Sequence, residues 1–229
     1  MQLKLILLLF YSIGGGIGTG LGHGRLLAWD PEQGQRRNVT AWPEVHGFGA
    51  GAIHLKYRFQ WTFPVEFSPH EPDTLYICSQ YVHKSTDFGH SYELISPDLT
   101  RNDPDKLQSS GGPLTADNSG AEIYCTIFAF VESPHEKGVF WAGSDDGLVH
   151  ISRDGGVNWT NVTPGGLPEW AMISMIEASP HDPATAYVAA TMYKHDDFRP
   201  FVFKTNDYGQ SWTMITNGMA DDEITRAVR

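Results

Sequence analysis

Three eight-residue stretches share one pattern: STDFGHSY at Ser85–Tyr92, SRDGGVNW at Ser152–Trp159 and TNDYGQSW at Thr205–Trp212. Their common form is Ser or Thr, any residue, Asp, any residue, Gly, two more residues and an aromatic residue. We call each copy an octet. The Asp can accept backbone N–H bonds and the Gly permits a positive φ, so each octet predicts a tight turn between two strands. Three copies in one chain indicate a repeat protein.

A second motif, Ser-Pro-His, precedes every octet, at residues 68–70, 133–135 and 179–181. An apolar run ends at each copy and a β-rich run follows it. Because proline ends a strand and presets the reversal, each unit predicts four antiparallel strands. Such units, repeated, are the blades of an all-β fold, the β-propeller. We expect blades at about residues 57–96, 123–163 and 171–217, a hairpin around Leu26 to Val39 and a stub after Asp221.

The octet resembles the Asp-box of Asp-box (BNR) repeat propellers, a class that includes sialidases, sortilin-type propellers and xyloglucanase-type glycoside hydrolases. Further segments resemble a bacterial group of sortilin-like Asp-box proteins classed as glycosyl hydrolases, over about Gly16 to Arg229. These segments are YRFQW at Tyr57–Trp61, SPDLTRND at Ser96–Asp103 and WAGSDDG at Trp141–Gly147. The resemblance implies a secreted protein that acts on a polysaccharide such as a β-glucan or xyloglucan. The likeness to sortilin implies the alternative, a non-catalytic propeller that binds protein or peptide ligands.

The octets depart from the family pattern at Tyr92, which stands where the first box usually has Trp. No catalytic motif of the sialidases or xyloglucanases matches, so no catalytic residue is carried over. We expect the octet Asp and Gly residues to be structural, since each turn needs its own: Asp87, Gly89, Asp154, Gly156, Asp207 and Gly209.

The order of strands and turns in each unit places the turns at two opposite ends of the blades. The Ser-Pro-His and octet turns join strand one to two and strand three to four, so they share one end. The turns between strands two and three, and the connections between blades, lie at the opposite end. Because loops on a rigid scaffold usually carry function, we expect the site at this opposite end.

Carboxylates, arginines and an aromatic residue gather in the loops of that end. Glycoside cleavage needs two carboxyl groups about 5–10 Å apart, one protonated and one ionised, and an aromatic ring can stack on a sugar. The candidate catalytic residues are Asp145, Asp146, Asp196, Asp197, Asp103 and Glu122. The candidate ligand-binding residues are Arg58, Arg101, Trp170, His195 and Arg199.

Each candidate also has a structural explanation. Asp and Gly are the residues that tight turns favour, so turn chemistry is the first explanation of Asp145-Asp146-Gly147. The run His195-Asp196-Asp197 fits a solvated loop. Arg101 and Asp103 fit an internal ion pair that holds the long connection between the first two blades.

Composition excludes several other classes. Acidic residues outnumber basic ones by 27 to 16, for a net charge of −11, which argues against nucleic acid as a partner. Two cysteines exclude a disulfide framework or a Cys-rich zinc module, and two separate buried thiols are favoured over one Cys78–Cys125 bond. No H-E-x-x-H, G-x-S-x-G or P-loop motif occurs, so we expect neither a metal nor a cofactor.

The N-terminal segment, residues 1–22, has two explanations. A charged start and the apolar run Leu5–Phe10 resemble a signal peptide, but no A-x-A-like cleavage site follows. The alternative is a buried strand of a chain that begins upstream. The run is too short to span a bilayer, and the first explanation predicts an extracellular or periplasmic protein.

The 229 residues hold about three blades, whereas propellers close with about four to eight. Residues 23–229 therefore predict a partial propeller, and we expect the chain to be a slice of a longer protein. In that case the blades serve as a scaffold that needs the further blades of the full-length chain.

Overall fold

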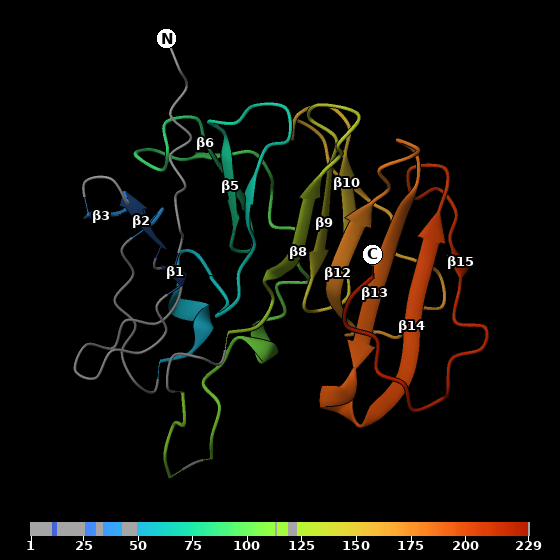
Figure 1. Ribbon diagram of the computed structural model, residues 1–229. Helices are drawn as coiled ribbons and strands as arrows, with labels where there is room; N and C mark the ends of the chain where they lie inside the picture. The colour runs from blue at the N-terminus through green and yellow to red at the C-terminus, as the bar shows by residue number, and fades with distance from the viewer. Residues whose placement is uncertain are drawn as a thin grey trace.

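The computed structural model describes residues 11–12, 26–30, 34–42, 50–112, 114–118 and 123–228. These residues form an all-β, incomplete propeller with three four-stranded antiparallel sheets side by side and a three-stranded sheet at one edge (Figure 1). In each four-stranded sheet the strands are paired in the order of the chain. Within the described part there are no α-helices, only the short 3₁₀ turns η1 (Ala52–His54), η2 (Pro104–Lys106) and η3 (Tyr193–His195).

The blades follow the repeats. The first blade consists of β4 (Val65–Phe67), β5 (Leu75–Cys78), β6 (Val82–Ser85) and β7 (Glu93–Leu94). The second consists of β8 (Ile127–Glu132), β9 (Phe140–Ser144), β10 (Val149–Ser152) and β11 (Thr160–Asn161). The third consists of β12 (Met172–Ala178), β13 (Ala186–Met192), β14 (Asp197–Thr205) and β15 (Thr213–Met214). The edge sheet contains β1 (Tyr11–Ser12), β2 (Leu26–Asp30) and β3 (Gln35–Asn38).

The first strand of the first blade is shorter than its apolar pattern predicts. The pattern favours a strand from Trp61, but β4 begins only at Val65. Phe63 N donates to the Gln60 carbonyl (3.3 Å), and the Gln60 side chain accepts from Thr62 N (2.5 Å), which closes a turn instead. Pro64 has no N–H to donate to a neighbouring strand, so pairing starts after it.

Each octet folds into a turn held by its Asp and by its first hydroxyl. In the third octet Asp207 Oδ1 accepts from Ser211 N (2.9 Å) and Thr205 Oγ1 accepts from Gly209 N (2.9 Å). Tyr208 and Gly209 both have positive φ, 58° and 83°. The other two octets repeat this bonding through Asp87 and Ser85, and through Asp154 and Ser152.

The octets also fasten each blade to the one before it. Trp212 Nε1 donates to the carbonyl of Val162, in the tail of the second blade (2.7 Å). A Cβ added at Gly209 would lie 2.8 Å from Val162 Cβ, so only glycine permits this close approach. The same contact recurs from Trp159 Nε1 to the Ile95 carbonyl (2.9 Å) and from Tyr92 Oη to the Val39 carbonyl (2.7 Å).

This repetition identifies the sheet at the edge. Because Val39 takes the place of Ile95 and Val162, the hairpin β2–β3 corresponds to strands three and four of a blade. Bonds from backbone to side chain agree, since Leu26 N donates to Thr40 Oγ1 (3.0 Å) as Val149 N donates to Thr163 Oγ1 (2.9 Å). The predicted hairpin is therefore the outer half of a further blade.

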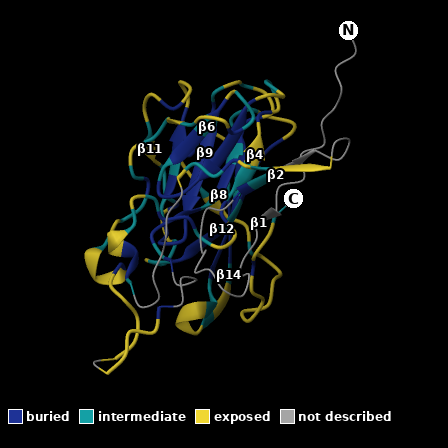
Figure 2. Cartoon of the chain, turned by 90° about the vertical axis from the view of Figure 1, so that its left-hand side faces the viewer, coloured by how far each residue is buried: buried dark blue, intermediate teal, exposed yellow. Residues whose placement is uncertain are grey.

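Apolar side chains fill the spaces between consecutive blades. The largest buried cluster joins the second and third blades around Trp141, Ile173 and Phe203, which are all at most 1% exposed. Figure 2 shows that buried residues lie in the middle of the blades, in strands such as β8, β9 and β12, and that exposed loops lie at both ends. Cys78 and Cys125 are buried and separate, with no disulfide between them. No helix among the described residues is long and apolar enough to cross a membrane.

Candidate functional site

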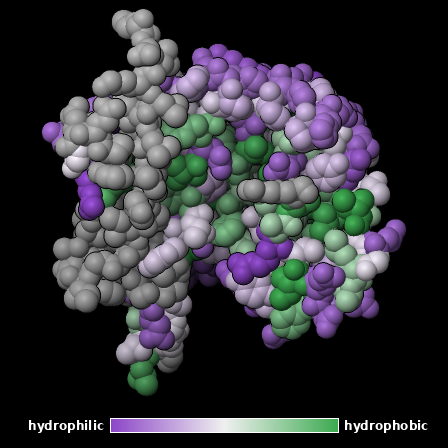
Figure 3. All heavy atoms as spheres, viewed as in Figure 1, coloured by the Kyte–Doolittle hydropathy of each residue, from purple (hydrophilic) through white to green (hydrophobic). Residues whose placement is uncertain are grey.

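A pocket lies between the second and third blades, at the end opposite the octet turns. It is a small hollow that opens to solvent, and it is lined by Tyr124, Asp145, Trp170, Met172, Thr191, Tyr193, Lys194 and His195. The lining comes from the turn after β9, the connection before β12, and η3 with the end of β13. We call it the Asp145 pocket. In Figure 3 hydrophilic residues dominate the upper rim of the molecule.

Asp145 is buried where β9 ends. Its two carboxylate oxygens accept from Thr126 N and Thr126 Oγ1, both at 2.8 Å, which joins the β9–β10 turn to the start of β8. Burial raises the pKa of Asp145 to about 7, and the charge of Asp146 adds to the increase, while the Thr126 N–H and Lys194 act in the opposite direction. The side chain is therefore a carboxyl that exchanges its proton near neutral pH.

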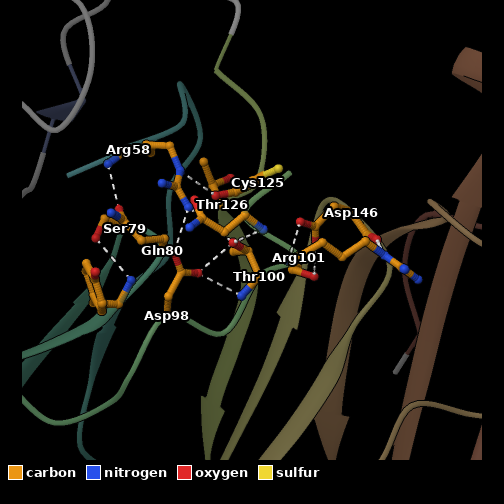
Figure 4. Close-up of polar contacts among 12 residues, drawn as sticks. Arg58, Ser79, Gln80, Asp98, Thr100, Arg101, Cys125, Thr126 and Asp146 are labelled. Atoms are coloured by element: carbon orange, nitrogen blue, oxygen red, sulfur yellow. Dashed lines mark hydrogen bonds and ion pairs between the residues drawn. The ribbon is translucent and has the colours of Figure 1, made fainter. Parts of the chain in front are cut away.

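Asp146 is fully buried and has a different environment. Ser144 Oγ donates to one of its carboxylate oxygens, and Arg101 N donates to the other at 2.8 Å. Arg101 Nε also donates to the Asp146 carbonyl (2.7 Å). These bonds fasten the connection from the first blade to the turn of the second, so Asp146 acts here as a structural anchor (Figure 4).

Trp170 forms one wall of the pocket. Its φ is 67°, in the left-handed region, and the turn is closed by Ala171 N, which donates to the Pro168 carbonyl (3.2 Å). The ring stacks on Tyr124 with centroids 6.2 Å apart and an interplanar angle of 29°. The Tyr124 hydroxyl is buried and has no hydrogen-bond partner among the described residues. Left-handed backbone at a bulky residue and an unpaired buried hydroxyl are both features of functional sites.

Arg58 is buried outside the pocket, in the network of Figure 4. Its Nε donates to the Cys125 carbonyl (3.0 Å), and Nη2 donates to Asp98 (2.9 Å) and Thr100 (3.1 Å). Its backbone N–H donates to Gln80 Oε1 (2.7 Å). The guanidinium is thus occupied in holding the connection between the first two blades.

The remaining candidates are spread over the same end of the molecule. Asp103 accepts from Asp105 N (2.9 Å) and begins η2. Asp196 ends η3 with a left-handed φ of 58°, and Asp197 forms an ion pair with Arg199 (2.6 Å). Arg101 pairs with Glu169 (3.0 Å) instead of Asp103. Glu122 lies outside the described residues, and its role stays a prediction.

The structure therefore brings three of the candidates, Asp145, Trp170 and His195, into one pocket. Tyr193 and Lys194 directly precede His195 in sequence but carry no motif, and Tyr124 belongs to an apolar segment that reads as the start of a strand. Sequence reasoning misses them because their role depends on packing between blades. No group of three or more His, Cys, Asp or Glu within the described ranges could hold a metal ion.

Comparison with known proteins supports the fold. No protein-family model matches the chain, and a search of curated proteins finds no match. Among solved structures, the GH74 enzyme of Niastella koreensis has a TM-score of 0.52 at 13% identity, over 86% of this chain and 27% of that enzyme. The GH74 xyloglucanase of Xanthomonas campestris has a TM-score of 0.49 at 17% identity, over 89% of this chain and 28% of that one.

A third structure is YCF48 from Cyanidioschyzon merolae, with a TM-score of 0.43 and 15% identity over 74% of this chain and 41% of that one. The chain thus spans less than half the length of each of these proteins. At these identities the likeness concerns the fold alone.

Proposed function

We propose that this chain is part of a secreted, glycoside hydrolase-like propeller that binds a polysaccharide at the Asp145 pocket and uses Asp145 as general acid. The observation that carries the proposal is the pocket itself, in which a buried carboxyl lies with two aromatic rings and an unpaired hydroxyl. The Tyr124 hydroxyl, which has no partner among the described residues, and the Trp170 ring stacked on Tyr124 line the pocket with this carboxyl.

Asp145 has the property that a general acid needs. An acid is effective when its pKa lies near the working pH, and burial raises the pKa of Asp145 to about 7. Its protonated form can donate to a glycosidic oxygen that enters the pocket. The Thr126 bonds fix the carboxyl in place at 2.8 Å, which holds it ready for that transfer.

Hydrolysis also needs a second carboxylate. Asp146 is adjacent in sequence, but its oxygens accept from Ser144 and Arg101 and serve the fold. Glu122, two positions before Tyr124, is our candidate for the base, to be tested by Glu122→Gln. A base from a blade of a longer protein is the other source that this proposal allows.

The test is a panel of xyloglucan and β-glucans, with binding and release of reducing ends measured on the same protein. We expect binding and release by the unaltered protein, and binding without release by Asp145→Asn. The control is Asp73→Asn, an exposed carboxylate near the first Ser-Pro-His turn, at the opposite end. No binding across the panel would refute the proposal. Saturable peptide binding without release of reducing ends would support the non-catalytic alternative instead.

A further inference from the structure

Four cations lie near two aromatic rings that line the Asp145 pocket, although the chain carries a net charge of −11. The Trp170 ring has the Arg101 guanidinium 4.8 Å and the Lys106 ammonium 5.4 Å from its centroid. The Tyr193 ring has the Lys194 ammonium at 6.0 Å and the Arg226 guanidinium at 5.4 Å. Trp170 and Tyr193, which both line the pocket, thus each have two positively charged groups near their rings.

Arg226 is brought here by the C-terminal segment. Thr225 is buried, and its hydroxyl donates to the Ala190 carbonyl (2.9 Å) and accepts from Phe201 N (2.9 Å). These bonds fix the segment across β13 and β14, next to the end of β13 that lines the pocket. The position of Arg226 is therefore built into the third blade.

Most of these cations form no ion pair with a described residue. Lys194, Lys106 and Arg226 form no salt bridge with another described residue. Arg101 pairs with Glu169, whose side chain is 67% exposed, so solvent screens that pair. Burial keeps the proton on Asp145 below about pH 7, which removes one negative charge from the pocket lining.

We propose that the pocket selects an acidic sugar, whose anionic group is bound by Lys194 and Arg226 beside Tyr193. This inference rests on the proposed function and names its substrate class. A neutral sugar would leave both cations without a counter-charge, whereas a carboxylate or a sulfate ester can accept from the guanidinium through two parallel N–H bonds. Both anions share this chemistry, so the experiment includes both.

The experiment is calorimetric titration of the full chain with three oligosaccharides of equal length. They are cellotetraose, a cellotriose that carries one glucuronic acid, and a sulfated cellotetraose. We expect at least one acidic oligosaccharide to bind about tenfold or more tightly than cellotetraose in ~50 mM salt, and this preference to shrink in ~500 mM salt. The tighter acidic ligand identifies the anion.

Two variants locate the effect. Lys194→Gln combined with Arg226→Gln should remove most of the preference, so that neutral and acidic ligands bind this variant with similar affinity. Lys204→Gln is the matched control, because Lys204 also lies over a tyrosine ring (Tyr187, 5.6 Å) but at the octet end of β14. Thermal denaturation should show that all variants fold.

The outcomes are separable. Equal binding of neutral and acidic ligands would overturn this inference and leave the proposed function intact. A preference that survives in the Lys194/Arg226 variant would overturn the assignment to these residues. If none of the three ligands binds, and the xyloglucan and β-glucan panel also fails, the proposed function is refuted together with the inference.

Discussion

Asp145→Asn should change how stability depends on pH. The substitution preserves shape, because Asn can accept from Thr126 N with its oxygen and donate from its amide to Thr126 Oγ1. It removes the ionisation of a carboxyl whose pKa burial raises from 3.8 to about 7. The difference between the two proteins therefore isolates the free energy of placing a charge at this site.

The sign and size follow from linkage. Below about pH 4 Asp145 is protonated in both the folded and the unfolded chain, and its ionisation costs nothing. Between about pH 4 and pH 7 the unfolded carboxyl loses its proton while the folded one keeps it, so stability falls by about 1.4 kcal/mol per pH unit. The total loss is on the order of 4 kcal/mol, and it is complete above about pH 7.

Two histidines change stability with pH in the opposite direction, so their contribution has to be removed from the comparison. Burial lowers the pKa of His83 and His150 to about 4, so both are neutral in the folded protein. Their unfolded forms take up protons below about pH 6.5, and stability therefore rises with pH from about 4 to 6.5. Because both proteins contain these histidines, their contribution disappears from the difference.

The assay is urea unfolding followed by tryptophan fluorescence at pH 4, 5, 6, 7 and 8. Relative to the unaltered protein, the free energy of unfolding of Asp145→Asn should increase by several kcal/mol between pH 4 and pH 8. The free energy of unfolding of Asp73→Asn should follow that of the unaltered protein at every pH. Parallel curves for the unaltered protein and Asp145→Asn would show that Asp145 is not a buried acid with a raised pKa.

Three further predictions concern the fold. In thermal denaturation, Gly209→Ala should lower stability by about 1–3 kcal/mol more than Gly166→Ala does. Both glycines have φ above 80°, but only Gly209 lies against Val162. Equal losses of stability would contradict the contact between blades. Arg58→Lys should lower stability by about 1–3 kcal/mol, because it loses hydrogen bonds to Cys125 and Asp98. Arg199→Gln should leave stability unchanged. A larger loss for Arg199→Gln than for Arg58→Lys would contradict the network assigned to Arg58. Cys78 and Cys125 should resist a thiol reagent in the folded protein, because burial raises the pKa of both thiols. In urea without a reductant both should react fully, since they form no disulfide. Fewer than two reactive thiols in urea would indicate a disulfide.

The fold could be predicted because its main signals are local. An octet specifies its turn with its own Asp, hydroxyl and Gly, so three copies predict three blades without knowledge of their packing. The contact of Trp212 with Val162 was not predictable, since it joins residues 50 positions apart. It depends on how one blade lies on the next.

The site was predictable only in part for the same reason. Asp145 and Asp146 are adjacent and look equivalent in sequence, yet one lines the pocket and the other anchors Arg101. The difference arises because successive side chains in a turn bond to different neighbours, Asp145 to Thr126 and Asp146 to Ser144 and Arg101. Arg101 and Asp103 illustrate the opposite case, in which proximity in sequence predicts a pair that the structure does not form.

The most direct test of the central claim is the pH profile of reducing-end release, measured for the unaltered protein and for Asp145→Asn on the best polysaccharide of the panel. If Asp145 is the general acid, release by the unaltered protein should fall as pH rises through about 7, and Asp145→Asn should bind the polysaccharide but release nothing. Undiminished release by Asp145→Asn, with the same pH profile, would contradict the account.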